Sequence, residues 1–155
     1  MPKSKPLEPR FRHLDQEKWQ EVRALEIGGR RAAVWEKWLD FTPGFLSLYA
    51  KWDPGMMIHR HGHESDHVVF VISGEMSCGD VRCTAGMHIS LPQGAAFGPF
   101  VAGPEGVELF EVMMGDPRSW PADPEGFAKL LAEKRARKLP DPAIELPDWL
   151  EDTRK

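Results

Sequence analysis

The stretch Gly55–Gly74, GMMIHRHGHESDHVVFVISG, decides how this chain of 155 residues is interpreted. It contains four of the six histidines, which are His59, His61, His63 and His67. An apolar run typical of a β-strand, 68–72, follows at once and ends at a Ser-Gly pair. Because imidazole is a common ligand of divalent metals, the stretch predicts a metal site built on strands.

Strand geometry selects among these histidines. Alternation places His59, His61 and His63 on one face, with neighbours about 6.6 Å apart. An adjacent pair can reach one ion, but three in a row cannot do so without a bend. His67 follows a short turn and would begin the antiparallel partner strand, about 5 Å away. We therefore predict His61, His63 and His67 as metal ligands. His59 is predicted to be a general acid or base beside the metal, or else a hydrogen-bonded interior histidine.

Part of this stretch also matches the motif of a different class of protein. His63-Glu64-Ser65-Asp66-His67 matches H-E-x-x-H, the zinc-protease pattern, which requires both histidines on one face of a helix. A glycine precedes this pattern, a strand-type run follows it, and no helical period surrounds it. The strand interpretation is therefore preferred over the protease.

The rest of the chain predicts an all-β fold. A leader with a short helix at about 15–25 is expected over 1–30, and a single antiparallel β-barrel or double-sheet jelly roll over 31–115. Residues 116–155 are expected to form a linker, a helix at about 124–138 and a tail packed on the barrel. The strands are predicted at 32–39, 45–52, 56–63, 67–73, 76–78, 81–83, 87–91, 97–101 and 107–114, with a turn at 102–106.

Composition excludes several classes of protein. The formal charge of −4 comes without a basic stripe, which argues against nucleic-acid binding. No signal peptide or apolar run of about 18 residues is found, so no membrane association and a cytoplasmic location are expected. Cys78 and Cys83 flank a predicted two-residue turn; two reduced thiols are favoured over a disulfide.

The motif spacing resembles the cupin superfamily. Gly55, His61, His63 and Gly74 match its first motif, with His67 where that motif has Glu. In the second motif Gly86, Pro92 and Gly94 match, whereas Phe97 replaces the ligand His and Val101 the Asn. The resemblance covers about residues 32–114. It implies the cupin fold, a divalent metal and a homodimer.

The same resemblance suggests further site residues. Three histidines would give a site similar to those of cupin dioxygenases that cleave β-diketones or oxidise thiols, although those enzymes take the third His from the second motif. Opposite parity sends either Glu108 or Glu111 inward from the last strand, where it is a candidate carboxylate for the site; an outward, solvated Glu is the alternative. His88 is a candidate catalytic, pocket-lining residue, and Tyr49 a candidate pocket donor. Phe97 is expected to make the pocket mouth apolar.

These observations predict a metal-dependent enzyme for a small organic substrate. A dioxygenase-type oxidoreductase with Fe²⁺ is favoured, and Zn²⁺, Mn²⁺ or Ni²⁺ are alternatives because histidine binds all of them. Three neutral ligands leave the metal its full charge, which favours anionic or enolate-forming substrates. A Zn or Mn isomerase, cyclase or lyase and a non-catalytic ligand-binding cupin are the alternative functions.

Overall fold

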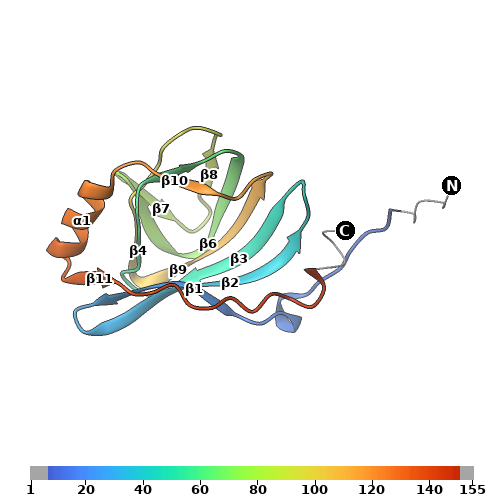
Figure 1. Ribbon diagram of the computed structural model, residues 1–155, viewed down its shortest axis with the longest axis horizontal. Helices are drawn as coiled ribbons and strands as arrows, with labels where there is room; N and C mark the ends of the chain where they lie inside the picture. The colour runs from blue at the N-terminus through green and yellow to red at the C-terminus, as the bar shows by residue number, and fades with distance from the viewer. Residues whose placement is uncertain (1–6, 151–155) are drawn as a thin grey trace.

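The computed structural model describes residues 7–150, and these form an antiparallel all-β fold with one α-helix. Figure 1 shows the strands curving around an interior, with the helix outside them. The elements in chain order are the 3₁₀ turn η1 (Leu14–Gln16), β1 (Gln20–Ile27), β2 (Arg30–Phe41), β3 (Leu46–Trp52), β4 (Met57–Ile58), β5 (His61–His63), β6 (Asp66–Cys78), β7 (Val81–Thr84), β8 (His88–Leu91), β9 (Phe100–Met114), β10 (Ser119–Pro121), α1 (Pro124–Glu133) and β11 (Ala136–Lys138).

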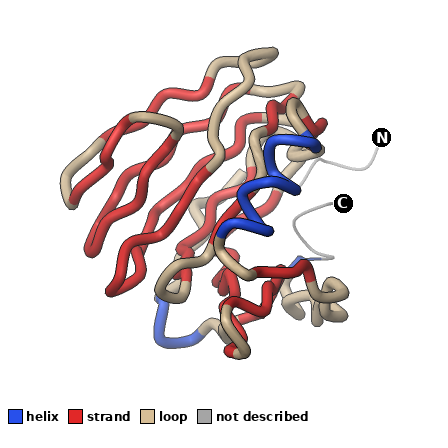
Figure 2. The backbone as a smooth tube through the Cα atoms, turned by 90° about the vertical axis from the view of Figure 1, so that its left-hand side faces the viewer, coloured by secondary structure: helices blue, strands red, loops and turns tan. Residues whose placement is uncertain are grey.

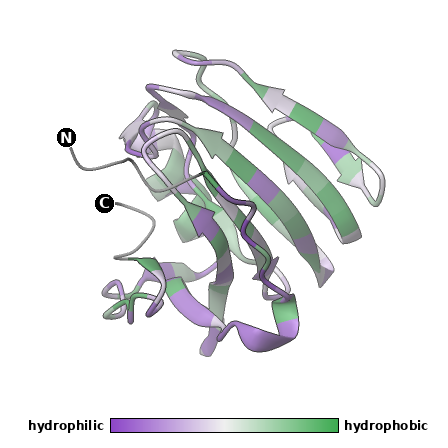
Figure 3. Ribbon diagram, turned by 90° about the vertical axis from the view of Figure 1, so that its right-hand side faces the viewer, coloured by the Kyte–Doolittle hydropathy of each residue, from purple (hydrophilic) through white to green (hydrophobic). Residues whose placement is uncertain are grey.

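Two sheets organise the molecule. Nine strands form one sheet in the order β11-β1-β2-β3-β9-β6-β7, with β4 also paired to β9 and β8 to β6. Strands β10 and β5 form a second, two-stranded sheet. This arrangement confirms the expected antiparallel jelly roll. Figure 3, coloured by residue hydropathy, shows hydrophobic and hydrophilic stretches along the strands.

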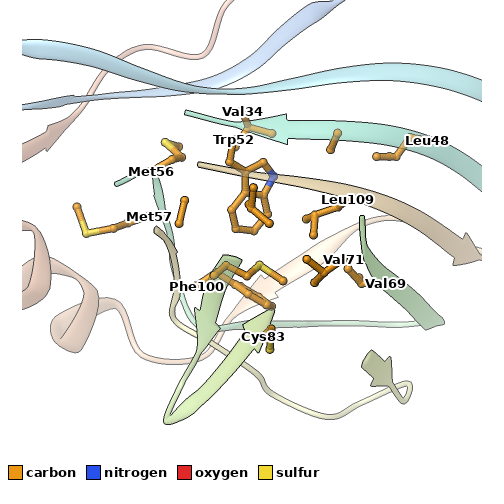
Figure 4. Close-up of a cluster of buried hydrophobic side chains, with 14 of the residues drawn as sticks. Val34, Leu48, Trp52, Met56, Met57, Val69, Val71, Cys83, Phe100 and Leu109 are labelled. Carbon is orange, nitrogen blue, oxygen red and sulfur yellow. The ribbon is translucent and has the colours of Figure 1, made fainter. Parts of the chain in front are cut away.

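The core lies between the inner faces of the strands. β3 shows strict alternation, with Leu46, Leu48, Ala50 and Trp52 buried and the residues between them partly exposed. Figure 4 shows Trp52 meeting other apolar side chains from β2, β6 and β9 in this interior. Burying such alternating faces removes apolar surface from water, which supplies the main favourable term in folding.

The N-terminal prediction is wrong in its main feature. In place of a helix at about 15–25, a single 3₁₀ turn is followed by the strand β1, which pairs with β2. Gly28 and Gly29 both have positive φ, so they close a two-residue hairpin instead of ending a helix. The apolar residues around Trp19 and Val22 are too few to distinguish the 3.6-residue period of a helix from the two-residue period of a strand. The large sheet therefore begins at Gln20, within the segment that was expected to be a leader.

The C-terminal prediction is partly right. Helix α1 is shorter than expected and ends at Glu133, after which Arg135 has positive φ and β11 pairs with β1. Figure 2 shows this helix as the long blue coil beside the red strands. In the tail Leu150 is buried, whereas Ile144 is exposed. The predicted turn at 102–106 is also wrong, because β9 continues through it opposite two irregularities in β6.

Three further expectations concern local features. The two-residue turn after Cys78 is present, and both Cys78 and Cys83 are free thiols. The H-E-x-x-H segment lies between β5 and β6 instead of on a helix, so the protease interpretation fails. Within residues 7–150 no helix has the length and apolar character needed to cross a membrane.

Candidate functional site

The four clustered histidines form a continuous row of rings. The strand expected at 56–63 breaks between β4 and β5, which provides the bend that the strand geometry requires. The ring centroids of His59 and His61 lie 4.8 Å apart, those of His61 and His63 5.0 Å, and those of His63 and His67 3.8 Å. The structure therefore brings the three predicted ligands together side by side.

Backbone carbonyls orient two of these rings. His61 Nδ1 lies 2.7 Å from the carbonyl oxygen of His59, and His63 Nδ1 lies 3.1 Å from that of Pro117. A carbonyl oxygen only accepts hydrogen bonds, so each Nδ1 carries the proton and each Nε2 keeps a free lone pair. Burial lowers the pKa of His61 to about 4 and also lowers the pKa of His63. Both rings are thus neutral near pH 7, as metal ligation requires.

His67 is the buried end of the row. Its side chain is 1% exposed, and neither ring nitrogen has a hydrogen-bond partner among residues 7–150. Its Nδ1 lies 3.6 Å from Glu111 Oε1, which is beyond hydrogen-bonding distance. Buried polar atoms are nearly always paired, so two unpaired nitrogens on one ring point to a missing partner.

The histidine side chains of the row are suitable ligands for a divalent metal. However, their ring nitrogens do not converge on a single metal position. Within the described part of the chain, no three His, Cys, Asp or Glu side chains form a complete metal-binding group. The fit lies in three imidazoles on neighbouring positions, two of them with the carbonyl-bonded Nδ1 that metal-bound histidines commonly have.

Strand register decides between the two candidate glutamates. Glu111 pairs with Leu48 and Val69, whose side chains are buried, and it lines the interior. Glu108 instead accepts hydrogen bonds from Tyr49 Oη at 2.8 Å and Ser73 Oγ at 2.9 Å. Glu111 is therefore the carboxylate beside the histidines.

Two predicted pocket residues lie on the outer face of the sheet. Tyr49, Phe110, Phe70 and His88 form one cross-strand row over β3, β9, β6 and β8. His88 is exposed in this row, and neither it nor Tyr49 lines the interior cavity. Both placements were wrong because alternation in β8 and β3 sends these side chains outward. Burial and the bond to Glu108 raise the pKa of Tyr49 to about 12.

A cavity of about 250 Å³ opens beside the histidine row. His61 and Glu111 form part of its wall, and Phe97 contacts both His61 and His63 with centroids 4.8 Å and 5.9 Å away. Phe97 thus makes this wall apolar, as expected. The remaining apolar lining includes Val34, Trp52, Met76, Phe100 and Leu109.

His59 occupies a different position. Its ring lies 5.9 Å from that of Phe127 on α1, and it lines a second cavity, of about 300 Å³, beneath that helix. Burial, followed by the charge of Arg23, lowers its pKa. His59 thus adjoins the predicted ligands without lining the first cavity, and its acid–base role stays a prediction.

The sequence interpretation missed two charged residues of the first cavity, Arg23 and Glu36. Arg23 lies on the segment expected to be helical, and Glu36 lies on a strand whose parity was not assigned. The Trp38 indole N–H donates to Glu36 Oε1 at 3.1 Å. Burial raises the pKa of Glu36 to about 7, and the charge of Glu111 adds to the rise.

This pKa predicts a pH-dependent stability. The folded state retains a proton on Glu36 up to about pH 7, whereas the unfolded chain releases it near 4.5. Stability must therefore fall as pH rises through that window. In chelator-treated protein we expect Glu36 to cost about 2 kcal/mol of unfolding free energy between about pH 5 and pH 8. Urea unfolding at both pH values measures this loss.

Between about pH 5 and pH 8, the unfolding free energy of the Glu36→Gln variant should fall by about 2 kcal/mol less than that of the wild type. Glu125→Gln, at an exposed position on α1, should follow the wild type. Equal pH dependence in the wild type and Glu36→Gln would contradict the raised pKa.

The overall fold resembles that of several known structures. A proposed acetylacetone dioxygenase from Methylibium petroleiphilum PM1 superposes with a TM-score of 0.63 at 19% identity, covering 81% of this chain and 88% of that chain. The polyketide cyclase RemF from Streptomyces resistomycificus superposes with a TM-score of 0.60 at 21% identity, covering 79% of this chain and 94% of that chain. An RmlC-like cupin from Shewanella frigidimarina NCIMB 400 superposes with a TM-score of 0.54 at 22% identity, covering 77% of this chain and 96% of that chain.

These likenesses establish the fold. Together with the strand order they show that the chain has the antiparallel jelly-roll fold of the cupin superfamily. The sequence itself matches no family model and no curated protein.

Proposed function

We propose that the protein is a metal-dependent enzyme that acts on a small organic substrate, with His61, His63 and His67 as the metal ligands. The observation that carries this proposal is the state of His67, whose two buried ring nitrogens have no hydrogen-bond partner within the described part of the chain. Its neighbours His63 and His61 add free Nε2 atoms in the same row. Glu111, 3.6 Å from His67, is placed to orient this ring or to join the ligand set.

The favoured reaction is a dioxygenase-type oxidation with Fe²⁺. A metal with three neutral histidine ligands and open positions would supply redox chemistry as Fe²⁺, or Lewis-acid chemistry as Zn²⁺ or Mn²⁺. Two of the three named structural neighbours are a proposed dioxygenase and a cyclase, and they support an oxidative or a non-redox enzyme by fold alone. A non-catalytic ligand-binding protein is the alternative.

The residues of the cavity have separate tasks in this proposal. Phe97 and the apolar wall exclude water and hold the hydrocarbon part of the substrate. Glu36 holds a proton: since Trp38 donates to Oε1, Oε2 is the oxygen left free to carry it. A pKa of about 7 lets this carboxyl both donate and accept a proton at neutral pH.

Metal analysis tests the site. Purified protein loaded anaerobically with Fe²⁺, or with Zn²⁺, should retain about one metal per chain after dialysis. His67→Ala should weaken binding by about 100-fold or more, because a ligand is lost and its supporting contacts with it. His88→Ala is the matched control, since this histidine is exposed on the outer face.

The outcomes separate the functions. Unchanged metal retention in His67→Ala would refute the ligand set. Oxygen uptake with a β-diketone, present in the wild type and absent in His67→Ala, would support the dioxygenase. A retained metal with no uptake would favour the Lewis-acid enzyme or the binding protein.

A further inference from the structure

A β-bulge turns Arg23 into the cavity. In the β1–β2 pairing, Glu21 lies opposite Trp35 and Arg23 lies opposite Val34, so Val22 is an extra residue. Glu21 forms an ion pair with Arg31. Without the bulge, Arg23 would share the face of Glu21, two residues away. With it, Arg23 joins the row of Val34 and lines the interior. Bulges commonly re-aim side chains next to active sites.

The guanidinium of Arg23 has no hydrogen-bond acceptor in the part of the chain that the structure describes. Within residues 7–150, no hydrogen bond or ion pair joins Arg23 to another group, although the neighbouring Glu36 lines the same cavity. Burial raises the pKa of Glu36 to about 7, so this carboxyl carries less than a full negative charge at neutral pH. A half-buried cation without an acceptor is unfavourable unless a ligand supplies one.

We propose that Arg23 binds the carboxylate of a small, otherwise apolar organic acid in the 250 Å³ cavity. This inference rests on the proposed function in taking that cavity as the substrate site. It adds an anchor on β1 and a substrate class that the histidine row does not define. Because Arg23 and His61 line the same cavity, an acid held at Arg23 stays beside the histidines.

The charge balance favours a carboxylate over a phosphate. Arg23 offers a planar fork of donors that matches a carboxylate. Among the residues that line the cavity Arg23 is the one arginine, beside the carboxyl groups of Glu36 and Glu111, so the second negative charge of a dianion would have no cation to balance it. Val22, Val34, Trp52 and Phe100 surround it with apolar surface, which suits an aromatic or aliphatic body.

Binding of benzoate and benzamide tests this proposal without any reaction. Calorimetric titration uses chelator-treated protein and is repeated in the His67→Ala background. The measured benzoate affinity then does not depend on whether the histidines bind a metal. Benzoate should bind the wild type in the millimolar range or tighter. Arg23→Met should weaken it by about tenfold or more, because a charge-assisted hydrogen bond is lost.

The controls isolate the guanidinium. Arg23→Lys keeps the charge without the fork and should fall between the wild type and Arg23→Met. Arg82→Met, at an exposed position on the β6–β7 hairpin, should bind benzoate like the wild type. Benzamide, which lacks the charge, should bind weakly and equally to the wild type and Arg23→Met. Equal benzoate affinity in the wild type and Arg23→Met, or no saturable binding to the wild type at millimolar concentration, would overturn the proposal.

Discussion

Replacing Gly62 by Ala is expected to lower the free energy of unfolding by about 3 kcal/mol and to displace the histidine row. Gly62 lies between His61 and His63 on β5 and is buried. A Cβ here would lie 2.5 Å from the carbonyl oxygen of Ala95 and would overlap the ring of Trp120. β5 pairs with β10 through Gly62 and Trp120, so the overlap must push these two strands apart.

The reason for so large an effect is that both neighbours are fixed. Ala95 contributes backbone, which cannot rotate away, and Trp120 is held in the two-stranded sheet. Gly62→Ala should therefore reduce metal retention as well as stability, although no ligand is changed. Urea unfolding and metal analysis of the same sample measure both effects.

Gly44→Ala is the matched control for this change. Gly44 also has an ordinary backbone conformation, and a Cβ there would only touch the Thr42 side chain at 3.6 Å. Its stability should stay within about 0.5 kcal/mol of the wild type. A Gly62→Ala variant as stable as Gly44→Ala would contradict the close packing of β10 on the H-G-H segment.

Replacing Gly74 by Ala is expected to cost about 3–4 kcal/mol, from backbone strain and overlap together. Gly74 has φ of +71°, a region that L side chains rarely adopt. An added Cβ would also overlap the carbonyl oxygen of Gly106 and lie 3.0 Å from Val107 Cα. Gly74 pairs with Val107 at an irregularity between β6 and β9, where the two backbones approach closely.

Gly86→Ala separates the two contributions at Gly74. Gly86 has φ of +94°, but nothing lies within 4 Å of an added Cβ. It should therefore show only the conformational cost, about 1 kcal/mol. Thermal or urea unfolding of both variants gives the difference. Equal losses in Gly74→Ala and Gly86→Ala would show that the approach of Gly106 has no energetic consequence.

Gly74 matched the first cupin motif by its spacing alone, and the structure gives this position a steric reason. The sequence also determined the antiparallel fold, because alternation is a local pattern that burial on one face preserves, as in β3. It placed His61, His63 and His67 in one group, since two-residue spacing and one short turn fix their separation to within a few ångströms.

The tertiary structure alone decided which other residues face the cavity. Which of Glu108 and Glu111 points inward depends on the strand partners of β9, and those partners are distant in sequence. The outward placement of His88 has the same origin. Arg23 faces inward only because a bulge in β1 shifts its register against β2. The residues of a strand determine its two-residue alternation. Which face points inward, and where the strand is irregular, depends on the strands that pair with it.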